Sequence, residues 1–200
     1  MKLIHSNTSP FVRKVMVALM ETGQRDAVEL ETVAVSPVNP GDVVPSLNPL
    51  GKIPCLILDN GNAIFDSRVI CRYVDSRHNS AKLYPEGAAL WPRLTLEAAA
   101  DGMVDAAILM IYERLLREES QRSPAWEEGQ WQKVARGLAY LEANVEKLEG
   151  LDMANIAVAC ALGYLEFRFA DRNWRVLAPN LSAWEADFSQ RPSMQATIPA

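Results

Sequence analysis

The sequence predicts a mixed α/β unit followed by an all-helical unit. Before about residue 80, short strand-like and helix-like segments alternate. After residue 88, every periodic segment has helical spacing. A polar stretch over 78–88, which includes Pro85, separates the two patterns and is expected to be a linker. We therefore expect an α+β domain over 1–77 and a helical domain over 89–200.

The segments of the first half can be assigned in order. Leu3 to His5 is a short apolar run that predicts a strand. Ser9 and Pro10 start a helix that ends at Gly23, because serine caps helices and proline is favoured in the first turn. The run 28–34 alternates apolar and polar residues, as a strand does, and 36–52 is expected to be a loop.

A hairpin and a helix complete this half. Ile53 to Leu58 is an apolar run, 59–62 is a turn signal, and 63–65 is the returning strand. Asp66 or Ser67 then caps a helix. The expected order is strand-helix-strand, then a loop, then strand-strand-helix. The two parts of this order connect their strands differently, so the four-stranded sheet should contain both parallel and antiparallel pairs.

The second half contains four expected helices. The first runs from Leu90 to Glu118, the second from Ser123 to near Gly150, and the last over 181–190. Between them, Asp152 is expected to cap a helix that is apolar almost all round and therefore central. Prolines 192 and 199 indicate a loose tail.

Composition excludes several functional classes. The 200 residues carry a net charge of −5, with 49% apolar and 22% charged residues, as in an ordinary globular protein. Basic residues are scattered in pairs such as Arg13-Lys14, which we expect on solvated helix faces. Without a basic stripe, neither a nucleic acid nor a membrane surface is an expected partner.

Cysteine and histidine usage narrows the chemistry further. Three separated cysteines, at 55, 71 and 160, favour a reducing, cytoplasmic location over a disulfide framework. With only two histidines, His5 and His78, we expect no metal site. Neither histidine has a spacing that identifies it as the base of a nucleophilic serine.

Three motifs in the first half and two in the second identify a resemblance that spans essentially the whole chain. Together they resemble bacterial members of the cytosolic glutathione transferases, which have a thioredoxin-like first domain and conjugate the thiol of glutathione to electrophiles, usually as dimers. The motifs are Thr8–Val15, Asn48–Pro54, Phe65–Ser67, Ala100–Met103 and Asn155–Tyr164.

The resemblance assigns the thiol chemistry to Ser9. A thiolate is the nucleophile, and lowering a thiol pKa by one unit takes about 1.4 kcal/mol of preferential stabilisation. A hydroxyl at a helix start can donate a hydrogen bond to sulfur. From spacing alone Ser9 is an N-cap; the family makes it the catalytic residue. Members that use a cysteine here exchange disulfides, so serine disfavours that activity.

The remaining glutathione contacts follow from the same resemblance. Pro54 would be a cis proline, with Ile53 pairing the cysteinyl backbone, and Lys52 would face the glycyl carboxylate. Asp66 and Ser67 would hold the ammonium and carboxylate of the γ-glutamyl end, although glutamate is more usual than Asp66.

One acidic residue of the second half is a further candidate. Asp101 lies one helical turn before Asp105. In related dimers an acid near Asp101 approaches the ligand ammonium across the interface, whereas a solvated helix carboxylate is the alternative.

We therefore expect a homodimeric glutathione transferase involved in detoxification, with glutathione as co-substrate and a small hydrophobic electrophile as partner. Two alternatives remain open. The first is a binding or regulatory protein that keeps the fold without turnover. The second is a glutathione-dependent isomerase or reductase.

Overall fold

The computed structural model of the protein describes residues 1–199, which form two compact units. The N-terminal unit comprises residues 1–85 together with the segment that begins at Pro192, and the helical unit comprises Glu86–Arg191. The two units divide between Pro85 and Glu86, within the polar stretch over 78–88. The final segment differs, because the structure groups it with the first unit and not with the helices.

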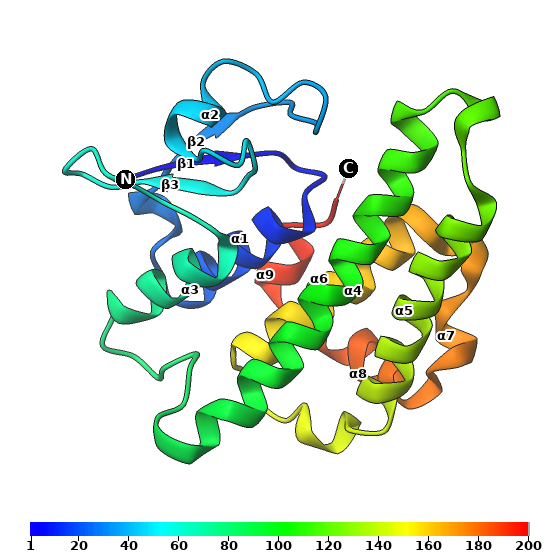
Figure 1. Ribbon diagram of the computed structural model, residues 1–200. Coiled ribbons are helices and arrows are strands. Elements are labelled where there is room, and N and C mark those ends of the chain that lie inside the picture. The colour runs from blue at the N-terminus through cyan, green and yellow to red at the C-terminus, as the bar shows by residue number, and fades with distance from the viewer. Residues whose placement is uncertain (200) are drawn as a thin grey trace. The chain divides into compact units, whose positions relative to one another are not determined.

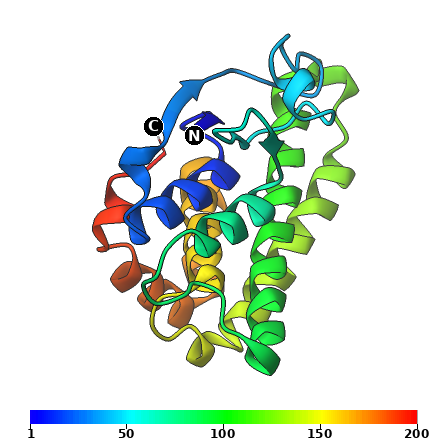
Figure 2. The same ribbon diagram turned by 90° about the vertical axis from the view of Figure 1, so that its left-hand side faces the viewer.

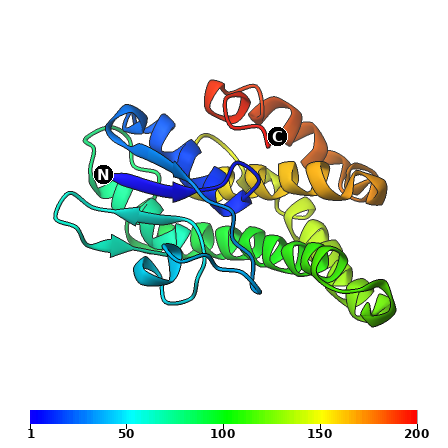
Figure 3. The ribbon, with the colours of Figure 1, turned by 90° about the horizontal axis from the view of Figure 1, so that it is seen from above.

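The N-terminal unit contains a mixed four-stranded sheet, which confirms the predicted fold class (Figure 1). The strand order is β2-β1-β3-β4; β1 pairs with β2 in parallel and with β3 antiparallel, and β3 pairs with β4 antiparallel. Figure 3 shows the strands side by side. The elements are β1 (Lys2–His5), α1 (Pro10–Glu21), β2 (Glu29–Thr32), α2 (Val44–Leu47), β3 (Cys55–Ile57), β4 (Ala63–Ile64) and α3 (Ser67–Ser76).

Helices cover both faces of this sheet. In Figure 1, α1 and α3 lie on one face and the one-turn helix α2 lies on the other. Apolar side chains spaced along α1, such as Val15 and Leu19, are fully buried, as are Ile70 and Val74 of α3. On the other face, Val44 of α2 packs in a cluster with residues of β1 and β3. This helix lies in the stretch that the sequence predicts to be a loop.

The helical unit is built around one apolar helix. It contains α4 (Leu90–Leu116), α5 (Pro124–Glu142), α6 (Met153–Phe169), α7 (Trp174–Leu177) and α8 (Pro179–Phe188). Figure 2 shows α4, in green, running alongside α6, in yellow to orange. Residues 156–162 are all buried, which confirms the central position expected for this helix. Among the described residues, only the stretch Met153–Arg172 is long and apolar enough to span a membrane, and most of it is buried in this unit.

Asp152 caps α6 as predicted. Its side chain accepts a hydrogen bond from the Asn155 backbone N–H at 3.0 Å. Arg93 of α4 donates from Nη2 to Asp152 at 2.7 Å and forms an ion pair with the same carboxylate. The buried Asn155 amide donates in turn to the Glu149 and Gly150 carbonyls. The start of α6 is therefore fixed by charge and hydrogen bonds from three segments.

The final segment is ordered by contacts with α1, so the expectation of a loose tail is wrong. Residues Pro192–Gln195 form the one-turn helix α9, whose Ser193 and Met194 are buried. Arg13 of α1 donates to the Met194 carbonyl at 3.1 Å and to the Thr197 hydroxyl at 3.4 Å. In Figure 2 this segment, in red, lies beside α1, in blue. Arg13 and Lys14 are accordingly buried, and not solvated as their pairing suggested.

Candidate functional site

Three chain segments that carry predicted site residues meet at one end of the sheet. Strand β1 runs into the Ser9 turn at its carboxyl end. Antiparallel pairing places the start of β3, just after Pro54, beside that end, with Ile4 opposite Cys55. Strand β4 is antiparallel to β3, so its exit into Asp66 returns to the same end. The sheet topology therefore gathers residues that lie far apart in the sequence.

Ser9 is the N-cap of α1. Its backbone is extended, and its hydroxyl oxygen accepts from the Val12 backbone N–H at 3.3 Å. Because a hydroxyl is both donor and acceptor, its O–H remains available to a ligand while the oxygen caps the helix. The capping role and a role in binding sulfur are therefore compatible in this geometry.

The first turn of α1 leaves one further donor. Pro10 has no N–H, the Val12 N–H is bound to the Ser9 side chain, and the Arg13 N–H is bound to the Ser9 carbonyl at 3.0 Å. Within residues 1–199 the Phe11 N–H has no hydrogen-bond partner. The helix start thus offers an anion two donors, the Ser9 hydroxyl and the Phe11 N–H, at its positive end. Phe11 is not among the site residues predicted from the sequence, although Pro10 at the first helical position already implies a helix start with an unbonded N–H.

The loop that carries Lys52 is organised by Asn48, which is almost completely buried. The Asn48 side chain donates to the Lys52 carbonyl at 2.8 Å and accepts from the Leu50 N–H at 3.0 Å. The Asn48 carbonyl accepts from Gly51 N–H at 2.8 Å. Asn48 therefore positions the backbone from which the exposed Lys52 side chain extends. Asn48 lies in one of the motifs found in the sequence, but its role could not be predicted there, because its partners are backbone groups.

Gly51 is required at its position in this loop. Its φ of 63° lies in the left-handed region, and a Cβ built there would approach Pro40 Cβ to 2.9 Å. Two residues later, the Ile53–Pro54 peptide bond is cis, which is the isomer that the resemblance implies. Ile53 is half-buried and Pro54 is buried.

Asp66 and Ser67 form the second helix start. The Asp66 carboxylate accepts from the Arg68 N–H at 3.0 Å and the Val69 N–H at 3.5 Å, so it is the N-cap of α3. Ser67 is the first helical residue, and neither its N–H nor its hydroxyl has a partner within the described chain. An exposed carboxylate thus lies next to two free donors, a pattern suited to a ligand that carries both an ammonium and a carboxylate.

The other candidates lie elsewhere. Asp101 is buried in α4 of the helical unit, so it is not a solvated helix carboxylate, whereas Asp105 on the same helix is exposed. His5 bonds through Nε2 to the Thr32 hydroxyl at 3.0 Å, and His78 bonds to Asp75. Neither histidine is hydrogen-bonded to Ser9. Across residues 1–199, no group of three or more His, Cys, Asp and Glu side chains is placed to hold a metal ion.

Comparison with known proteins places both units in one family. Residues 8–77 match the glutathione S-transferase N-terminal domain, and residues 124–187 match the glutathione S-transferase C-terminal domain. A curated relative, the uncharacterized GST-like protein YibF of Escherichia coli, is 34% identical over 100% of this chain and 98% of its own length.

Two solved structures are more similar still. A glutathione transferase family member from Pseudomonas fluorescens Pf-5, with bound glutathione, is 50% identical; the match covers 100% of this chain and 98% of that one, with a TM-score of 0.98. A second structure of such a family member from the same strain holds S-(propanoic acid)-glutathione; it is 49% identical, with full coverage of both chains and a TM-score of 0.93.

A thioredoxin-like unit with a mixed four-stranded sheet, followed in sequence by a helical unit, defines a glutathione-transferase fold. With both domains matched and a relative at 34% identity over 98% of its own length, the chain belongs to the bacterial glutathione S-transferase family.

Proposed function

We propose that the protein is a glutathione transferase that binds glutathione in its N-terminal unit, stabilises the thiolate, and adds it to a small hydrophobic electrophile. The observation that carries the proposal is the convergence of the Ser9, Pro54 and Asp66 segments at one end of the sheet. The same end bears donors and a carboxylate of the kinds that a charged tripeptide requires.

Each end of glutathione has a complement in this arrangement. The ammonium of the γ-glutamyl group pairs with the Asp66 carboxylate, and its carboxylate accepts from the free N–H and hydroxyl of Ser67. The exposed Lys52 ammonium forms an ion pair with the glycyl carboxylate. The backbone of Ile53 forms hydrogen bonds with the backbone of the cysteinyl residue. Because Asp66 already caps α3 with one oxygen, its second oxygen remains for the ammonium.

The thiolate is held by Ser9 and the start of α1. The Ser9 hydroxyl donates to sulfur, and the Phe11 N–H adds a donor on the axis of the helix dipole. The stabilised sulfur attacks the electrophilic carbon, forming a C–S bond while a leaving group departs or a conjugated double bond takes up a proton. Ser9 itself forms no covalent bond, because a serine nucleophile needs a neighbouring base.

We further propose that the working form is a homodimer in the cytoplasm and that Asp101 contributes to binding of the ligand ammonium. All three cysteines are buried and none forms a disulfide, which supports a reducing compartment. The length and apolar composition of α4, with Leu109 and Leu115 exposed, support a dimer.

The test combines binding with turnover. Calorimetry should show saturable glutathione binding, and Ser67→Ala should weaken it, with Ser76→Ala at the far end of α3 as the matched control. Turnover is then assayed with glutathione and a panel that contains 1-chloro-2,4-dinitrobenzene and acrylate, since the latter would give the type of thioether that the Pseudomonas fluorescens protein holds. Absence of glutathione binding overturns the proposal. Binding without turnover on any electrophile would favour a binding protein instead.

A further inference from the structure

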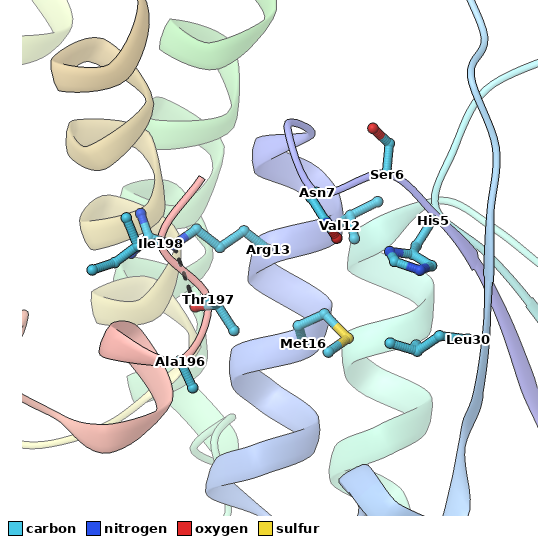
Figure 4. Close-up of a pocket in the computed structure, with 10 residues that line it drawn as sticks. All are labelled: His5, Ser6, Asn7, Val12, Arg13, Met16, Leu30, Ala196, Thr197 and Ile198. Carbon is cyan, nitrogen blue, oxygen red and sulfur yellow. Dashed lines mark hydrogen bonds between the residues drawn. The ribbon is translucent and has the colours of Figure 1, made fainter. Parts of the chain in front are cut away.

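A cavity lies between α1, β2 and the final segment of the chain. None of the residues that we propose to contact glutathione lines it. Its volume is about 170 Å³. Arg13 and Met16 line it from α1, Leu30 from the edge strand β2, His5 from the end of β1, and Thr197 and Ile198 from the final segment. All of these residues belong to the N-terminal unit (Figure 4). The lining contains none of the N-terminal residues assigned to glutathione, which are Ser9, Lys52, Ile53, Asp66 and Ser67.

The charged group in this cavity is Arg13, whose side chain is only 7% exposed. Its two hydrogen bonds go to neutral acceptors, the Met194 carbonyl and the Thr197 hydroxyl. A guanidinium has five N–H donors, so donors remain unused. Within residues 1–199 Arg13 forms no ion pair. A buried cation without a counterion is costly, and such charges are ordinarily paired.

Among residues 1–199, the nearby titratable groups do not neutralise this charge. The carboxylates of β2, Glu29 and Glu31, both lie within ion-pair distance of Lys2, at 3.3 and 3.2 Å. Burial, followed by the nearby charge of Arg25, lowers the pKa of His5, so the imidazole is neutral near pH 7. The described lining of the cavity therefore carries one positive charge, that of Arg13, which matches a monoanion.

Apart from Arg13, the lining combines polar residues such as Ser6, Asn7 and Thr197 with apolar ones such as Met16 and Leu30, and its volume sets the size of the occupant. Figure 4 shows Arg13 reaching toward Thr197 and Ile198, while the sulfur of Met16 points toward Leu30 and His5. A cavity of about 150 Å³ is large enough to hold benzene. The volume of about 170 Å³ therefore suits a ligand with a short hydrocarbon body or one ring.

We propose that this cavity is a second binding site, separate from the glutathione site, and that it takes a small monocarboxylate. The carboxylate binds the free donors of the Arg13 guanidinium, whose planar fork matches carboxylate geometry. The hydrocarbon body lies against Met16 and Leu30. Because Arg13 also holds Met194 and Thr197, an occupant binds next to the attachment of the final segment to α1.

The test uses methyl resonances of the full-length protein labelled at methionine, with butyrate and benzoate as probes. Only the Met16 methyl should shift strongly among the seven methionines, and the shift should saturate. Butyramide, which has the same shape without the charge, should bind at least about tenfold more weakly, because it loses one charge-assisted contact. Arg13→Gln should cause a similar loss, and Arg77→Gln, which removes one exposed charge from the same unit, should cause none.

A second variant keeps the proposal testable if Arg13→Gln does not fold. Met16→Trp fills the cavity and leaves Arg13 in place, so it should abolish the response, read from amide resonances of Thr197. Equal affinity for butyrate and butyramide, unchanged binding in Arg13→Gln, or no saturable shift at millimolar probe overturns the proposal. Displacement of butyrate by glutathione would show one shared site and would also overturn it. Ser67→Ala, which tests the glutathione site, should leave butyrate binding unchanged.

Discussion

Replacing Ser9 by alanine removes two interactions from the start of α1. The first is the cap, in which the Ser9 oxygen accepts from the Val12 N–H at 3.3 Å. Losing it should lower the free energy of unfolding by about 1 kcal/mol. The second is the proposed hydrogen bond from the Ser9 hydroxyl to the thiolate, and bonds to charged groups contribute about 1.5–3 kcal/mol.

The second loss acts on the thiol pKa. At about 1.4 kcal/mol per unit, the pKa of bound glutathione should rise by roughly one to two units in Ser9→Ala. Glutathione affinity should change little, because the charged ends of the ligand are held elsewhere. Near neutral pH, each unit of rise in the thiol pKa should lower the rate about tenfold, because the fraction of thiolate falls by that factor. It should recover at alkaline pH, where solvent takes the proton.

The assay is a pH–rate profile with one reactive electrophile, together with ultraviolet titration of the bound thiolate. Ser9→Gly separates the two effects, since glycine at an N-cap costs only about a few tenths of a kcal/mol and also lacks the hydroxyl. Both variants should show the same pKa rise, whereas only Ser9→Ala should be clearly less stable. Superimposable profiles for wild type and both variants would refute the role of the hydroxyl and leave the Phe11 N–H as the remaining donor from the helix start.

Four further outcomes are expected. Asp152→Ala should lower the free energy of unfolding by about 2 kcal/mol, because it removes a cap and the carboxylate bound by Arg93; Asp152→Asn, which still caps, should lose less in the same urea titration. Gly51→Ala should be more destabilising in thermal melts than Gly41→Ala, since both have positive φ but only Gly51 lacks room for a methyl group. Burial raises the pKa of Tyr164 to about 12, so stability should be unaffected by this group below its ordinary value of 10.0 and should fall as pH rises from there toward 12; Tyr164→Phe should reduce that fall. Light scattering at micromolar concentration should give the mass of a homodimer, and a monomeric mass would contradict this expectation.

Local sequence signals predicted most of the elements and the caps. Serine before proline predicted the start of α1 at Pro10, and Asp66 and Asp152 each cap the helix that follows them. These predictions succeed because a cap involves residues within three positions of each other. The mixed sheet could also be predicted, from the order of strands and helices and from the hairpin.

The one-turn helix α2 could not be predicted from local sequence signals. The stretch over 36–52 is rich in proline, asparagine and glycine, and it was expected to be a loop. Val44 is nevertheless buried against β1 and β3, and this packing supports a short helix that its own propensity would not. Asn48 likewise acts through backbone partners, which a residue pattern does not reveal.

The sequence by itself determined the two-part architecture, the helix starts and the residue types of the candidate glutathione site, because periodicity, caps and motifs are written in neighbouring positions. Only the tertiary structure decided that the final segment belongs with α1, that Arg13 and Lys14 are buried, and that a cavity opens beside Met16. Arg13 and Met194 are 181 positions apart, so the hydrogen bond between them depends on the path of the folded chain. No periodic pattern in the sequence indicates it.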